Sequence, residues 1–153
     1  MVRPDKIKAA LLDASSLLGV IVDAPEFRCL GSLLAAVERG EVQLVESTAI
    51  LAEVLVEHSK DTPRHARARE TLRALLESPE TQLVDVSTAV ARKAGELKVR
   101  LGLKTWDAVH LATAILAGVD VLVVRDHKFP EGYYEGVYVT GPFNIDGDKL
   151  PLG

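Results

Sequence analysis

Short apolar runs alternate with longer helical patterns along most of this chain. The apolar runs are five or six residues long and have the composition of strands buried on both faces: AALLD, VQLVES, QLVDV and VDVLVV. Helical patterns lie between them, over residues 25–41, 47–60, 64–78, 87–102 and 105–118. This alternation predicts βαβ units, so we expect an α/β fold, a three-layer α/β/α sandwich around a central, mostly parallel sheet.

Capping residues mark the ends of several helical patterns. Serine and threonine hydroxyls can accept a hydrogen bond from the first turn of a helix, and glycine adopts the left-handed conformation in which many helices end. We therefore expect helix starts at Ser47, Ser87 and Thr105 and helix ends at Gly40, Gly102 and Gly118.

The segment after Phe129 differs from the rest because it is rich in glycine, proline and tyrosine. We expect GVYVT (136–140) to add one edge strand and the remainder to be loop. The 153 residues suit a single domain over 1–153, with a core at about 9–140 and a C-terminal tail at 141–153.

Composition limits the compartment and the partners. Hydrophobic residues make up 48% of the chain, which is typical of a globular protein, and the net charge of −4 gives no overall attraction for nucleic acid. Contact with nucleic acid would need a local basic patch. Cys29 is the only cysteine, which excludes an internal disulfide and fits a reducing compartment. Since the sequence has no secretory signal or membrane-spanning run, we expect a cytoplasmic protein without a membrane partner.

Four carboxylates lie in or beside apolar segments. Asp13 ends the first apolar run, and Asp126 lies two positions after the last one, with Arg125 between. Asp107 lies in the first turn of the last helical pattern, and Glu53 lies inside an apolar helical pattern. The carboxyl ends of parallel strands share one edge of a sheet, which is where ligands bind. We expect these acids to meet at that edge.

Carboxylates gathered in one pocket repel one another unless a cation or a proton compensates their charge. Oxygen ligands suit Mg²⁺ or Mn²⁺, and such an ion can activate a water molecule and neutralise charge on a phosphodiester. The residues alone therefore indicate a divalent-metal phosphoesterase. Structural alternatives exist: Asp13 could cap the SSLL segment that follows, and Asp107 could merely interact favourably with the positive end of its helix. Asp126 could begin a turn, and Glu53 could face solvent.

Four segments resemble PIN-domain ribonucleases of the VapC toxin type. LLDASSLL resembles the opening strand with its first acid, and STAILAEVL resembles the helix that carries the family's glutamate. LKTWDAVHLATAILAGVDVLV resembles the helix and strand around the third acid, and VRDHKF resembles the segment of the fourth acid. The segments occur in the family's order from about residue 11 to residue 129.

The resemblance implies endonucleolytic cleavage of RNA with Mg²⁺ or Mn²⁺ as cofactor. By matching position, Asp13 and Asp107 would ligate the metal, and Asp126 would do so directly or through water. Glu53 would hold a metal-bound water or tune the cluster, and Ser15 could hydrogen-bond a metal-binding carboxylate. The resemblance also implies a homodimer and a cognate antitoxin, as in type II toxin–antitoxin pairs.

Two adjacent positions depart from the family pattern. Members usually have Thr or Ser and then a small polar residue before the fourth acid, where this chain has Val124 and Arg125. Arg125 either contacts a phosphate or pairs with Asp126 and competes with the metal, and on the second hypothesis Arg125→Asn raises cleavage. The departure supports an alternative function, a catalytically weak or inactive PIN-like module that binds RNA or protein. A response-regulator-like or phosphatase-like domain is a third hypothesis, although no suitable Asp–Lys pair is evident.

Further polar residues flank the acids. Lys104 is the basic residue nearest to Asp107 in sequence and is the best candidate for a phosphate contact. His127 follows Asp126 and is a candidate for contact with substrate. His110 lies three residues after Asp107 and shares its helix face, so it could bind metal, transfer a proton or be a packed structural histidine.

Overall fold

A computed structural model describes residues 2–56, 59–125 and 129–147. Two residues of the predicted site, Asp126 and His127, lie outside the described residues.

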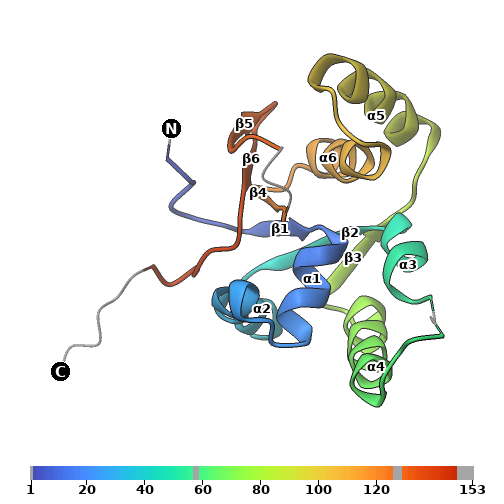
Figure 1. Cartoon of the computed structure of the whole chain (residues 1–153). Coiled ribbons are helices and arrows are strands. Elements are labelled where there is room, and N and C mark those ends of the chain that lie inside the picture. The colour runs from blue at the N-terminus through green and yellow to red at the C-terminus, as the bar shows by residue number, and fades with distance from the viewer. Residues whose placement is uncertain (1, 57–58, 126–128, 148–153) are drawn as a thin grey trace.

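Six strands form one sheet with helices on both of its faces (Figure 1). The sheet order is β3-β2-β1-β4-β6-β5, and every neighbouring pair is parallel except β5–β6. The strands are β1 (Ala9–Leu12), β2 (Gln43–Ser47), β3 (Thr81–Val84), β4 (Val121–Val123), β5 (Gly132–Tyr134) and β6 (Val137–Thr140). The predicted α/β fold with a central, mostly parallel sheet is confirmed.

Two helical layers enclose the sheet (Figure 1). One layer contains α5 and α6, and the other contains α1, α2 and α4. The helices are α1 (Ala14–Ile21), the 3₁₀ helix η1 (Pro25–Leu30), α2 (Gly31–Glu38), α3 (Ala49–Val54), α4 (Pro63–Glu77), α5 (Thr88–Leu101) and α6 (Thr105–Ala117). In the described part of the chain, no helix is both long enough and apolar enough to cross a bilayer.

The core consists of two clusters, one on each face of the sheet. Successive side chains of a strand point to opposite faces, so Leu11 packs with the α5–α6 layer while Leu12 packs with the other layer. Strands β1 and β4 are buried on both faces, which explains why their sequences are continuous apolar runs.

The position of the last strands corrects the prediction for the C-terminal segment. We expected GVYVT to be an edge strand, but β6 lies between β4 and β5, and β5 forms the edge. The two strands form a hairpin whose turn residues, Glu135 and Gly136, both have positive φ, as a type I′ hairpin turn requires. The short run that forms β5 has no alternating pattern, so its sequence does not indicate a strand.

Several predicted helix ends are wrong by one or more residues. Ser47 is the last residue of β2, where it pairs with Val84, and Thr48 is the N-cap of a helix that ends at Val54. Lys104 caps α6 in place of Thr105. The helical pattern at 25–41 is two elements, η1 and α2, and the helix α1 was not predicted as an element. The predicted cap at Ser87 and the left-handed ends at Gly102 and Gly118 are confirmed.

Candidate active site

Asp13 lies at the carboxyl end of β1 and is held there by backbone groups of three residues, one in α1 and two at the end of β4 and just after it. Its own N–H donates to the carbonyl of Val123 at 2.9 Å. Its Oδ1 accepts from the N–H of Ser16 at 2.8 Å, and its Oδ2 accepts from the N–H of Arg125 at 3.1 Å. The residue is only 8% exposed. Asp13 therefore caps α1, and each of its oxygens keeps a second acceptor direction that could serve a cation.

The sheet topology puts Asp13 at a switch point. The chain leaves β1 toward β2 on one side, whereas β4 pairs with β1 on the other side. In open α/β sheets, ligands bind beyond the carboxyl ends of the strands at such a point. The location expected for the acid cluster is therefore the location of Asp13.

Glu46 is an acid of this region that the sequence analysis missed. It lies on β2, it is fully buried, and its Oε1 accepts from the N–H of Leu12 at 3.1 Å. In the register of β1 and β2, Ala9 pairs with Gln43 and Ala10 pairs with Leu44. Leu12 lies beyond these pairs, and the Glu46 side chain accepts its N–H in place of a backbone partner on β2. Within the described residues, its Oε2 has no hydrogen-bond partner.

The environment of Glu46 shows that other carboxylates are close to it. Burial raises the pKa of the Glu46 carboxyl well above its usual range, although the hydrogen bond from Leu12 opposes this. Repulsion by Asp13 and Glu53 raises this pKa further. The charges of Asp13, which follows β1, and of Glu53 on α3 thus both act on Glu46 at this end of the sheet. The only sequence signal for Glu46 is its position directly after Leu44 and Val45 in the run VQLVES.

Glu53 and His110 meet although they are 57 positions apart. The Nε2 of His110 lies 2.7 Å from the Oε1 of Glu53. The His110 side chain is 2% exposed and the Glu53 side chain is 22% exposed. Glu53 therefore does not simply face solvent, and His110 is a packed, hydrogen-bonded histidine.

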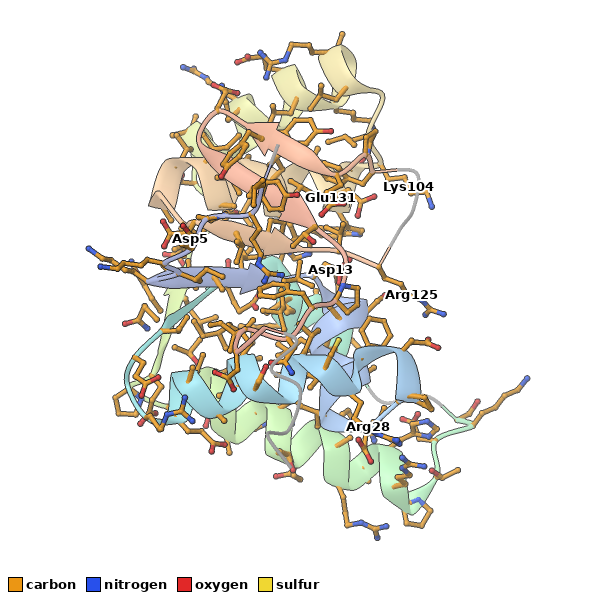
Figure 2. The ribbon with its side chains drawn as sticks, turned by 90° about the vertical axis from the view of Figure 1, so that its left-hand side faces the viewer. Asp5, Asp13, Arg28, Lys104, Arg125 and Glu131 are labelled. Carbon is orange, nitrogen blue, oxygen red and sulfur yellow. The ribbon has the colours of Figure 1, made fainter. Side chains whose placement is uncertain are left out.

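Asp107 and Lys104 lie at the start of α6. Asp107 is half-buried in the first turn, one turn before His110, and Lys104 is the exposed N-cap residue. Figure 2 shows Lys104 and Arg125 on the side of the molecule toward which the Asp13 end of β1 points. Ser15 is exposed in the first turn of α1, and no hydrogen bond links it to a carboxylate of the described residues. Its predicted role stays a prediction.

Arg125 contributes its backbone and its side chain to different neighbours. Its N–H donates to Oδ2 of Asp13, a contact made by the backbone and therefore independent of the residue type at this position. Its side chain is 63% exposed and extends toward η1, with a nitrogen 3.8 Å from Oε1 of Glu26 and the guanidinium carbon 6.0 Å from the Phe27 ring centre. Such an exposed pair is weak, so Arg125 remains available to an anion.

The donor chemistry of the site fits a hard divalent cation. Asp13 has spare acceptor directions, and the unpartnered Oε2 of Glu46 is a buried oxygen beside two further acids. A cation compensates such a charge arrangement. Among the described residues, no group of three or more His, Cys, Asp or Glu side chains lies close enough to ligate one ion. The predicted set of Asp13, Asp107 and Asp126 includes a residue outside that range and stays a prediction.

Comparisons with known proteins agree on one family. The model of the PIN domain family matches residues 10–133. A comparison with curated proteins gave no match.

Solved structures with the same fold include three from toxin–antitoxin systems. A toxin–antitoxin complex from Klebsiella pneumoniae is 24% identical with a TM-score of 0.63, over 88% of this chain and 98% of that one. VapBC2 of Rickettsia felis, bound to a promoter DNA fragment, is 18% identical with a TM-score of 0.62, over 87% and 98%. VapC20 of Mycobacterium tuberculosis, a toxin that cleaves the sarcin–ricin loop, is 17% identical with a TM-score of 0.60, over 78% and 92%.

Proposed function

Since the chain belongs to the PIN domain family, we propose that it is a divalent-metal-dependent endoribonuclease and the toxin of a VapBC-type pair. The observation that carries this proposal is the position of Asp13, fixed by backbone N–H groups at the switch point of the sheet beside Glu46 and Glu53. A carboxylate fixed in this way needs no reorganisation to bind a cation, and its neighbours add negative charge that favours binding.

Asp13, Asp107 and Asp126 are the residues that we propose to hold Mg²⁺ or Mn²⁺. When bound, the ion supplies Lewis-acid activation of a water molecule and neutralises charge on the phosphodiester. The backbone N–H groups of Ser16 and Arg125 keep the Asp13 carboxylate in place. Hydrolysis forms a bond from the water oxygen to phosphorus and breaks one P–O bond to a ribose, whose oxygen takes up a proton.

Glu53 is suited to orient the attacking water. Its Oε1 is occupied by His110, which leaves Oε2 to accept a hydrogen bond from that water. Lys104, Arg125 and His127 are the proposed contacts to RNA, with the first two offering positive charge to the phosphate backbone.

Partners and compartment are part of the same proposal. Large apolar side chains that are exposed, such as Leu83, Val86 and Val99, support burial against a second protein chain. The Klebsiella and Rickettsia structures are complexes of toxin–antitoxin systems, which supports a cognate antitoxin. We propose a homodimer that acts on RNA in the cytoplasm and is restrained by its antitoxin.

Removing divalent metal is expected to stop RNA cleavage completely, because the acids alone repel a phosphodiester. The measurement is cleavage of a labelled structured RNA in Mg²⁺ or Mn²⁺, then in excess chelator, and again after the metal is restored. Activity that persists in chelator would reject the proposal. Mn²⁺ titration by calorimetry tests the alternative, because a non-catalytic module would keep its fold and take up no ion.

Arg125→Asn is expected to weaken RNA binding, because the side chain extends away from Asp13 toward Glu26 and is free to meet a phosphate. We expect KM to rise about threefold to tenfold with kcat unchanged. A phosphate contact outside the acid cluster stabilises the bound substrate and the transition state equally. The backbone N–H that braces Asp13 is retained in this variant. A rise in kcat would instead support the hypothesis that Arg125 competes with the metal.

A further inference from the structure

The pair formed by His110 and Glu53 joins two elements that are far apart in the sequence. His110 lies on α6, three residues after Asp107, and Glu53 lies near the end of α3. The imidazole is almost completely buried, whereas the carboxylate keeps part of its surface in solvent. The pair thus lies at the boundary between the core and the acid cluster.

The hydrogen bond fixes which imidazole nitrogen carries a proton. An ionised carboxylate can only accept hydrogen bonds, so Nε2 of His110 must donate to Oε1 of Glu53. Nδ1 of His110 is buried and has no hydrogen-bond partner among the described residues. An apolar side chain would fill this position without leaving an unsatisfied nitrogen. Within the part of the chain that the structure describes, the imidazole therefore makes one hydrogen bond, the one to Glu53.

The element that carries Glu53 needs such an anchor. Helix α3 has only six residues, and its N-cap Thr48 makes no side-chain capping bond. A glutamate has three side-chain torsions, and holding it in one rotamer without a partner is entropically unfavourable. Helix α6, in contrast, has 13 residues and is buried along most of its length, so it offers a rigid point of attachment.

Glu53 also belongs to the acid cluster electrostatically, because its charge acts on the buried carboxyl of Glu46. The helix that anchors Glu53 is the same helix that carries Asp107 one turn earlier. A change in the orientation of His110 would therefore alter the position of Glu53 relative to Asp107.

From this geometry we infer that His110 is a positioning residue, which holds the Glu53 carboxylate in one orientation through Nε2–H and leaves the second oxygen for catalysis. This inference rests on the proposed nuclease function for its catalytic consequence, but the pairing itself can be measured without activity.

The first test compares two amides at position 110. In His110→Gln, the side-chain nitrogen stands as many bonds from the backbone as Nε2 and can donate to Glu53, whereas in His110→Asn it is too close to the backbone. We expect His110→Gln to keep most of the single-turnover cleavage rate in Mn²⁺ and His110→Asn to lose about 10- to 100-fold. Equal rates for the two variants would overturn the inference. Thr113→Ala is the control, because it removes a buried hydroxyl bonded to Val109 on the same helix.

The second test is a double-mutant cycle with Glu53→Ala. If His110 acts through Glu53, His110→Asn lowers the rate in the wild-type background and has no further effect in Glu53→Ala. A purely structural histidine would lower the rate by the same factor in both backgrounds, which would overturn the inference. Melting temperatures of the four proteins identify any part of the loss that comes from unfolding.

The third test needs no catalysis. Nitrogen NMR of metal-free protein labelled at histidine is expected to show a protonated Nε2 at His110 whose resonance shifts in Glu53→Ala. A resonance that is the same in both proteins would overturn the inference. If the shift is present and wild type does not cleave RNA, the positioning of Glu53 is supported and the nuclease function is rejected.

Discussion

Asp107→Asn is expected to lower metal-dependent RNA cleavage by about 100- to 1,000-fold, the usual cost of removing one group that stabilises charge in a transition state. The substitution keeps the shape of the side chain and its place in the first turn of α6 while removing the charge that we assign to metal binding. The measurement is the single-turnover rate at saturating Mg²⁺ or Mn²⁺.

Asp120→Asn provides a matched control for this variant. Asp120 precedes β4 and accepts hydrogen bonds from the N–H groups of Lys8 and Ala9, at the amino ends of β1 and β4 and thus at the opposite end of these strands from Asp13. An asparagine oxygen can accept the same bonds, so we expect unchanged cleavage. Equal activity of Asp107→Asn and wild type would remove Asp107 from the proposed site.

The same Asp107→Asn protein also tests whether the acids repel one another. In chelator, removing one carboxylate from a crowded cluster should raise the melting temperature. A lower melting temperature at matched ionic strength would contradict the clustering of Asp107 with Asp13 and Glu53.

Glu46→Gln is expected to stabilise the metal-free protein at neutral and alkaline pH by about 1–3 kcal/mol, the range for a buried polar group that lacks a partner. Burial and neighbouring acids raise the pKa of Glu46 above its ordinary value of 4.5, so the folded protein binds this proton more tightly than the unfolded chain does. The stability that Glu46 contributes is present below pH 4.5 and is lost as pH rises toward its folded pKa.

The measurement is the free energy of unfolding of both proteins in chelator between pH 4 and pH 8.5. The advantage of Glu46→Gln should be near zero at the acidic end and should grow with pH. Glu41→Gln is a control of opposite sign, because Arg39 lowers the pKa of the exposed Glu41 carboxyl. In that control, the advantage of wild type should disappear as the pH falls. Parallel pH profiles for Glu46→Gln and wild type would show that Glu46 titrates alike in the folded and unfolded states.

The layer architecture could be predicted because it follows from local patterns. Apolar runs buried on both faces, such as β1 and β4, are recognisable from composition alone. The neighbours of a strand are not recognisable in this way, and so β6 was expected at the edge although it lies inside the sheet. Its inner position depends on β5, whose three residues carry no strand signal of their own.

The candidate site was predictable only in part, for a similar reason. Asp13 stands out because a charged residue directly follows an apolar run, and its capping of α1 agrees with one of the expected alternatives. Glu46 gives a weaker signal, because it lies inside a short run with other polar residues, and no local pattern indicates that its side chain accepts from the N–H of Leu12 on the neighbouring strand. The bond between His110 and Glu53 depends on how α3 and α6 meet in space, which no local pattern encodes.

The hydrogen bond from Arg125 to Asp13 has a consequence for how the protein is made. Residue 125 is held in place by β4, and β4 is fixed on its outer side by β6, with Val124 donating to the carbonyl of Thr140. A nascent chain on the ribosome cannot complete this arrangement until residues 137–140 have emerged and paired. Asp13 thus acquires its final surroundings only after β6, which is synthesised later than Asp13, has paired with β4, and on the proposed nuclease function a polypeptide that still lacks β6 is expected to be inactive.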